Sequence, residues 1–172
     1  LGSQFYGMTQ KEISTAIDVK TGGTLTKLLE NLMESGIIRA YPRYGKERVE
    51  TVYQLIDFFS LFYLRFIQGK QAKKGIWNSI HGTPIFYTWA GDTFELLCVE
   101  HLPQIQDTLR IASINRNYCW SGKSPDGRGA QIDLLLESKA DRTDYLCEMK
   151  FTGGKYAITK NDEEDFLNKI EA

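Results

Sequence analysis

Apolar residues near the start of the chain recur at helical spacing. Between Leu25 and Met33, leucines and a methionine stand at intervals of three and four residues, which predicts one helix with a single buried stripe. Upstream, Thr9 is followed three residues later by Glu12, the pattern of a capping box at the start of a shorter helix. Gly36 is well placed to end the longer helix. This part of the chain is therefore expected to form two helices joined by a turn.

The next segment is typical of two strands. Residues 37–44 and 49–55 flank a short turn that contains Gly45. Two helices followed by a hairpin is the element order of a winged helix-turn-helix domain, and we assign this domain to residues 1–56.

A dense apolar run follows the hairpin. Residues 58–67 are apolar on nearly every side of a helix, and such a helix is usually buried on every side. We expect it to bridge two domains, or to join the subunits of a homo-oligomer through residues 57–68. Together with the lysine-rich stretch after it, this helix makes a linking segment over residues 57–75. The run contains Arg65 and is far shorter than the ~20 residues that span a bilayer.

The second part of the chain, residues 76–172, is expected to begin with a loop over residues 76–83 and to continue with a long helix. Pro84 suits the first helical turn, where its missing N–H would have no partner, and the helix is predicted to reach about Leu102. Glu95 lies near the edge of the apolar stripe of this helix. Taken alone, such a position is more typical of an exposed glutamate than of a catalytic one.

Two short strands are predicted at residues 130–137 and 145–151. In the second strand the side chains alternate, so that Glu148 and Lys150 share one face. Pairing of the strands brings Asp133 beside Glu148. Two close carboxylates repel, and a divalent cation removes the repulsion, so this is a candidate Mg²⁺ or Mn²⁺ site with a lysine to stabilise negative charge. The residues alone leave open an alternative, in which Glu148 and Lys150 face solvent on a half-buried strand.

Charge is distributed unevenly in a chain whose net charge is −1. Residues 1–74 carry eleven Lys and Arg against seven Asp and Glu, whereas residues 75–172 carry ten against fifteen. A basic first part fits a nucleic-acid-facing module, and an acidic second part fits a carboxylate-bearing one. A protein-docking role for the first part fits equally well, because the outward face of its second helix also carries acids. The candidate phosphate contacts are Lys27, Arg39, Arg43, Lys46 and Arg48.

The three cysteines are too few and too scattered for a zinc cluster, and their odd number does not suggest a disulfide framework. No signal peptide opens the chain. We therefore expect a cytoplasmic protein. The abrupt first and last residues suggest a fragment of a longer one.

The acidic positions and their spacing resemble the PD-(D/E)XK nuclease signature, with Asp133 on one strand and Glu148-Met149-Lys150 on the next. That fold also uses a glutamate on a preceding helix, and Glu95 stands at the matching place. This chain departs from the signature before Asp133, where Ile132 stands in place of a proline. That proline is often replaced in such folds. The resemblance implies a restriction-endonuclease-like mixed sheet of the α+β or α/β class. It also implies metal ligands at Asp133, Glu148 and Glu95, catalysis aided by Lys150, and a water oriented by Gln131.

Beyond this motif, residues 8–67 and 77–172 resemble the C-terminal region of a family of bacterial and archaeal AAA-type ATPases. In that family a P-loop ATPase domain precedes a winged helix and a nuclease-like domain. The resemblance implies a missing N-terminal ATPase domain that would carry any ATP binding. The most specific pieces are Gly22–Leu25, Tyr53–Asp57, Phe94–Leu97, Gln131–Leu135 and Cys147–Phe151.

Two functions are expected from these patterns. The first is a metal-dependent phosphodiester hydrolase that acts on DNA. The second is a catalytically silent module of the ATPase, which binds DNA, docks protein or regulates. The acids on the second helix and the acidic second part of the chain favour the silent module.

Overall fold

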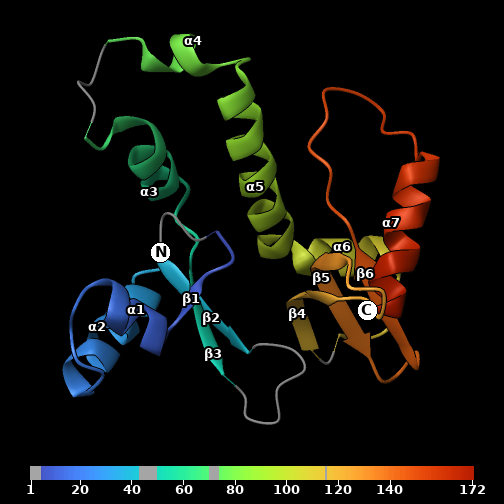
Figure 1. Cartoon of the computed structure of the whole chain (residues 1–172), viewed down its shortest axis with the longest axis horizontal. Coiled ribbons are helices and arrows are strands. Elements are labelled where there is room, and N and C mark those ends of the chain that lie inside the picture. The colour runs from blue at the N-terminus through green and yellow to red at the C-terminus, as the bar shows by residue number, and fades with distance from the viewer. Residues whose placement is uncertain (1–4, 43–49, 70–73, 115) are drawn as a thin grey trace. The chain divides into compact units, whose positions relative to one another are not determined.

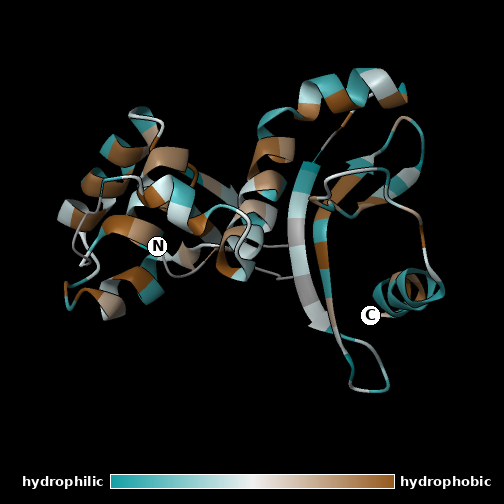
Figure 2. Ribbon diagram, turned by 90° about the horizontal axis from the view of Figure 1, so that it is seen from above, coloured by the Kyte–Doolittle hydropathy of each residue, from teal (hydrophilic) through white to brown (hydrophobic). Residues whose placement is uncertain are grey.

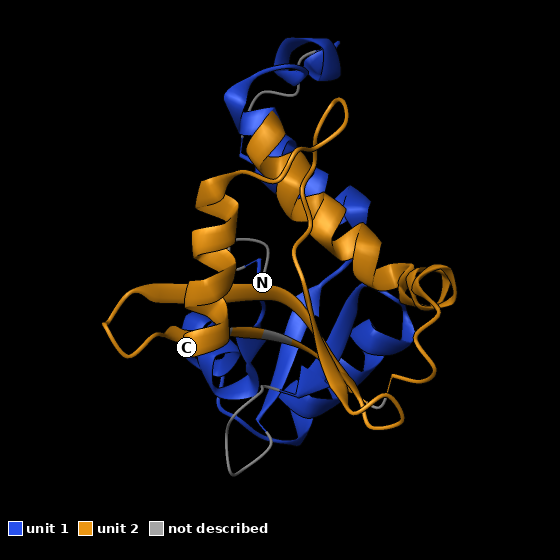
Figure 3. Cartoon of the chain, turned by 90° about the vertical axis from the view of Figure 1, so that its right-hand side faces the viewer, with its two compact units in different colours: residues 1–86 blue, residues 87–172 orange. Residues whose placement is uncertain are grey.

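Two antiparallel three-stranded sheets, each with its own helices, organise the described part of the chain (Figure 1). The structure is a computed structural model that describes residues 5–42, 50–69, 74–114 and 116–172. It is an α+β fold, in agreement with the coarse fold class expected from the sequence. The chain divides into two compact units, residues 1–86 and 87–172 (Figure 3). No helix among the described residues is both long enough and apolar enough to cross a membrane.

The first unit combines a sheet of order β1-β3-β2 with helices that precede the hairpin. The capping box predicted at the first helix is confirmed, because Thr9 Oγ1 accepts a hydrogen bond from Glu12 N (3.2 Å) and Glu12 Oε2 accepts one from Thr9 N (2.7 Å). The elements in chain order are β1 Met8–Thr9, α1 Gln10–Ala16, α2 Gly23–Glu34, β2 Ile38–Pro42 and β3 Thr51–Leu55.

Helix α2 ends as its sequence predicts. Gly36 adopts a φ of +69°, which a residue without a Cβ accepts readily. Its N–H donates to Met33 O (2.9 Å) and the next N–H donates to Leu32 O (3.0 Å), which is a Schellman motif. The predicted apolar stripe is only partly buried, because Leu25 and Leu29 are 1% and 2% exposed whereas Leu28 is 49% exposed.

The apolar run after β3 differs from its prediction. It forms α3 Phe58–Phe62 and then one turn of π-helix, Tyr63–Ile67. Within this chain only part of the run is buried, including Leu61 and Phe66, whereas the side chain of Phe59 is 69% exposed. Burial on every side is therefore wrong for the single chain, because the unit covers one face of the helix and leaves the other in solvent.

A short helix, α4 Ile76–Ile80, replaces the loop predicted there. The indole of Trp77 explains this helical turn, since it packs edge-to-face on Phe86 at 5.5 Å between ring centroids and lies 6.1 Å from the ring of Phe62. Local sequence did not indicate these aromatic contacts, which join segments separated along the chain.

The second unit contains a sheet of order β4-β5-β6, in which the central strand β5 is buried on both faces. On one face, Leu134 and Leu136 pack with Ile111; on the other, Ile132 and Leu135 pack with Tyr118. Helix α7 is largely hydrophilic (Figure 2). The elements are α5 Pro84–Glu100, which begins in the first unit, then α6 Leu102–Leu109, β4 Arg116–Lys123, β5 Gly129–Ser138, β6 Thr143–Cys147 and α7 Lys160–Glu171.

One strand in this unit ends earlier than predicted. Strand β6 ends at Cys147 and not at residue 151, because Met149 N donates to the side chain of Asp133 and not to a backbone carbonyl. The N-cap of α7 is Thr159, and Asp162 completes a capping box three residues later.

Replacing Leu136 by alanine tests the core of the second unit. The side chain is fully buried, so Leu136→Ala removes apolar contacts and leaves a cavity, at an expected cost of about 2–5 kcal/mol in the free energy of unfolding. The control is Leu109→Ala, at a position 60% exposed, for which we expect a change within about 0.5 kcal/mol. Denaturant unfolding followed by circular dichroism measures both, and equal losses would contradict this packing.

Candidate functional site

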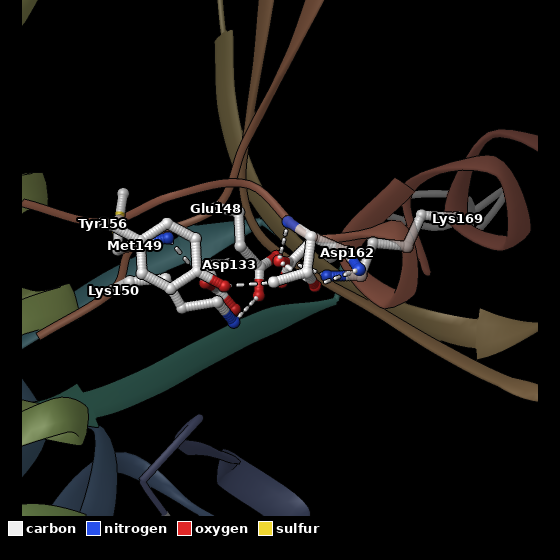
Figure 4. A network of polar contacts seen from close by, with 8 residues as sticks. Asp133, Glu148, Met149, Lys150, Tyr156, Asp162 and Lys169 are labelled. Carbon is white, nitrogen blue, oxygen red and sulfur yellow. Dashed lines mark hydrogen bonds and ion pairs between the residues drawn. The ribbon is translucent and has the colours of Figure 1, made fainter. Parts of the chain in front are cut away.

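The pairing of β5 with β6 places two carboxylates side by side (Figure 4). The last paired residues are Leu134 and Cys147, so the next step along both chains brings Asp133 opposite Glu148. Asp133 is only 7% exposed, and its Oδ2 accepts a hydrogen bond from Met149 N at 3.0 Å. This bond fixes the chain immediately beyond β6 and holds Glu148 at the edge of the sheet.

Glu148 is held between two lysines. Its Oε1 accepts a hydrogen bond from Lys150 Nζ at 2.6 Å, and its Oε2 accepts one from Lys169 Nζ on α7. Burial alone would raise the pKa of Glu148, but these two charge-assisted hydrogen bonds hold it below its ordinary value. The hydrogen bond between Lys150 and Glu148 also raises the pKa of Lys150. Glu148 is therefore a carboxylate whose charge is already balanced from within the chain.

Glu95, on α5, is part of the same electrostatic site. Burial raises its pKa to about 8, and the negative charges of Asp133, Asp92 and Glu148 add to the rise. Burial also raises the pKa of Asp133, with a further contribution from Glu148. The structure thus brings the predicted residues Glu95, Asp133, Glu148 and Lys150 into one mutually interacting group within the second unit.

The oxygen donors of this group suit Mg²⁺ or Mn²⁺, which prefer carboxylate ligands. Their present arrangement does not yet form a metal cage, since no group of three or more His, Cys, Asp or Glu side chains within the described ranges is placed to hold a metal ion. The two lysines also oppose a cation there. Both oxygens of Glu148 accept a hydrogen bond from an ammonium, so a divalent ion bound to Glu148 would be repelled by these neighbouring positive charges.

Gln131, predicted to orient a water molecule, lies on β5 two residues before Asp133. The register of β4 against β5 shifts between Ile132 and Leu135, so simple alternation does not fix which face the side chain of Asp133 shares with Gln131. Gln131 is half-buried.

Three polar residues of this network were missed by sequence reasoning. Tyr156 donates a hydrogen bond to Asp162 at 2.5 Å between oxygens, and the positive charge of Lys150 acts on both side chains. The hydrogen bond from Thr159, supported by the one from Tyr156, lowers the pKa of Asp162 to about 2. Lys169 is the third residue. Helical spacing puts Lys169 on the same face of α7 as Asp162 and Phe166, but no sequence pattern indicates that this face meets Glu148.

The predicted phosphate contacts that the structure describes, Lys27 and Arg39, belong to the first unit. Lys27 is exposed on α2. Arg39 lies on β2, where its Nε donates to Gln54 Oε1 at 2.8 Å and its guanidinium lies 5.5 Å from the ring centre of Tyr41. The remaining candidates, Arg43, Lys46 and Arg48, lie outside the described residues.

Neither a protein-family model, nor a curated protein, nor a solved structure matches this chain. The chemistry of the site is therefore the basis for assigning a function.

The raised pKa of Glu95 predicts a pH-dependent change in stability. Folding favours the protonated carboxyl, so its contribution is complete below pH 4.5 and is lost as pH rises to about 8. Glu95→Gln stays neutral and escapes this loss. In the absence of divalent ions, we expect the variant to be more stable than wild type at pH 8 by about 1 kcal/mol, a value reduced for partial solvation, and indistinguishable from it at pH 4.

Thermal unfolding at several pH values measures this difference. The matched control is Glu100→Gln, which removes an exposed carboxylate from the same helix and should show no such trend. A stability difference that does not grow between pH 4 and pH 8 would show that the pKa of Glu95 is not raised by burial and by the neighbouring carboxylates.

Proposed function

We propose that the second unit is a Mg²⁺- or Mn²⁺-dependent phosphodiester hydrolase of the PD-(D/E)XK type that acts on DNA. The observation that carries this proposal is the closeness of Asp133 to Glu148 just beyond the end of β6, next to Lys150. A third carboxylate, Glu95, has its pKa raised to about 8 by burial and by the neighbouring carboxylates. A site that concentrates carboxylates in a half-buried place gains most from a divalent ion.

In this proposal Asp133 and Glu148 hold the ion, and Glu95 completes the ligand set. When bound, the ion supplies Lewis-acid activation and neutralises charge that develops on the phosphate. Lys150 has a side chain 42% exposed beside Glu148, so its ammonium can turn toward a phosphate oxygen and stabilise that charge. Gln131, two residues before Asp133 on β5, orients the attacking water.

The first unit, in this proposal, is a winged helix that binds DNA or docks protein. The element order β1-α1-α2-β2-β3 and its antiparallel sheet support the winged helix. Lys27 and Arg39 would contact phosphates together with Arg43, Lys46 and Arg48. We further propose that the whole chain is the C-terminal part of a cytoplasmic AAA-type ATPase. The exposed apolar face of residues 57–68 would then join copies of the protein.

A second candidate function is favoured by a specific observation. Both oxygens of Glu148 are occupied by lysines, and the described residues contain no ready group of three ligands. A nuclease-like unit of this kind would bind DNA or a protein partner without cutting. It would serve the ATPase as a regulatory or docking module.

Nuclease assays test the first proposal. With Mg²⁺ or Mn²⁺ and plasmid or single-stranded DNA, we expect cleavage that falls about 100-fold or more in Asp133→Asn and in Lys150→Ala. Asparagine retains an oxygen for the Met149 N–H, so the first variant keeps the fold while losing a ligand charge. Asp144→Asn, which changes an exposed carboxyl on β6, is the control and should cut normally. Unchanged cleavage by Asp133→Asn would refute the assignment.

Calorimetric titration separates the two candidates without relying on activity. We expect Mg²⁺ at millimolar concentration to release or absorb heat with wild type, and the signal to disappear in Asp133→Asn because the ion loses a charged ligand. The Asp144→Asn control should retain the signal. Absence of binding by wild type would instead support the silent module.

A further inference from the structure

Lys169 has no role in the proposed chemistry, yet it is the more buried of the two lysines on Glu148. Its side chain is 14% exposed, against 42% for Lys150, and its Nζ donates to Glu148 Oε2 from a position 21 residues along the chain. The ammonium lies 5.8 Å from the ring centre of Phe166 on the same helix. Both the aliphatic part and the ammonium of Lys169 are therefore held in one position beside the Glu148 carboxylate.

Helix α7 is anchored so that Lys169 is delivered to this place. The preceding residue, Asn168, is 6% exposed, and its Nδ2 donates to Gly129 O at the start of β5 (3.1 Å). At the other end of the helix, Thr159 and Asp162 form the capping box, and Tyr156 donates to Asp162. Asn168 and Lys169 are neighbours in sequence, and they bind Gly129 on β5 and Glu148 beyond β6. Together these two contacts hold the C-terminal end of α7 against the sheet.

We propose that Lys169 is a built-in competitor of the divalent ion: while α7 is docked, its ammonium occupies Glu148, and metal loading requires it to withdraw. The inference rests on the proposed metal site. An ammonium and a divalent ion bound to the same carboxylate repel each other, because two positive charges are then held only a few ångströms apart. Lys150 is half in solvent and leaves Glu148 easily. Lys169 is held by the helix that carries it, so its withdrawal loosens α7. The docked helix thereby keeps the affinity for metal low.

Calorimetric titration with Mn²⁺ tests the competition directly. We expect Lys169→Met to bind Mn²⁺ at least about 10-fold more tightly than wild type, a change of about 1.4 kcal/mol, because Glu148 loses its buried counter-ion while the apolar stem is kept. Lys169→Arg keeps the charge and should bind as weakly as wild type. Lys160→Met removes an exposed lysine from the same helix and controls for net charge, with an expected change below about 2-fold.

A measurement on wild type covers the case in which Lys169→Met does not fold. Hydrogen exchange with and without saturating Mn²⁺ should show the amides of residues 160–171 exchanging about 10-fold faster in the loaded protein, since the helix gives up its ion pair. Amides of β5 serve as the internal reference and should not exchange faster. Slower or unchanged exchange in α7 would overturn the proposal.

The outcomes separate the inference from the function on which it rests. If neither wild type nor Lys169→Met binds Mn²⁺ at millimolar concentration, the metal site itself is wrong. If wild type binds and Lys169→Met binds equally or more weakly, the metal site stands. Lys169 would then position Glu148 for the ion, and the competition would be refuted.

Discussion

The hydrogen bond from Met149 N to the Asp133 carboxylate is the contact on which the site depends. It takes the place of the next backbone bond of the sheet, so β6 stops at Cys147 and the chain turns away. Met149 directly follows Glu148, so its hydrogen bond to Asp133 also fixes how the carboxylates of Asp133 and Glu148 lie relative to each other. A buried carboxylate that accepts a backbone N–H thus ends a strand and positions a polar site at once.

Charge balance decides the rest of the arrangement. Two carboxylates in a half-buried place cost free energy unless cations meet them, and the chain supplies Lys150 and Lys169 from opposite sides of Glu148. Glu95 is half-buried beside the same carboxylates, and burial and their negative charges raise its pKa to about 8. The site therefore has one carboxylate that is internally neutralised and one that is prone to protonation. A catalytic metal site and a silent binding site differ chiefly in whether an external cation displaces the internal ones.

The two units show different relations between apolar pattern and burial. Strand β5 in the second unit is covered on both faces, as its near-continuous apolar sequence predicts. The run at residues 58–67 is equally apolar, yet Phe59 and other side chains of one face remain exposed in the single chain. An apolar sequence indicates that burial of the segment is favourable, but it does not show which other surface covers the segment.

Local chemistry allowed the sequence to determine the capping box at Thr9, the helix end at Gly36 and the pair of strands that brings Asp133 close to Glu148. Each depends on residues within one turn, or on a strand period of two, and such patterns are written in neighbouring positions. Tertiary structure alone decided the end of β6, the helix at Trp77, the exposed face of residues 58–67 and the arrival of Lys169 at Glu148. These features depend on contacts between distant segments, whose geometry emerges only when the chain packs, so no spacing along the sequence encodes them.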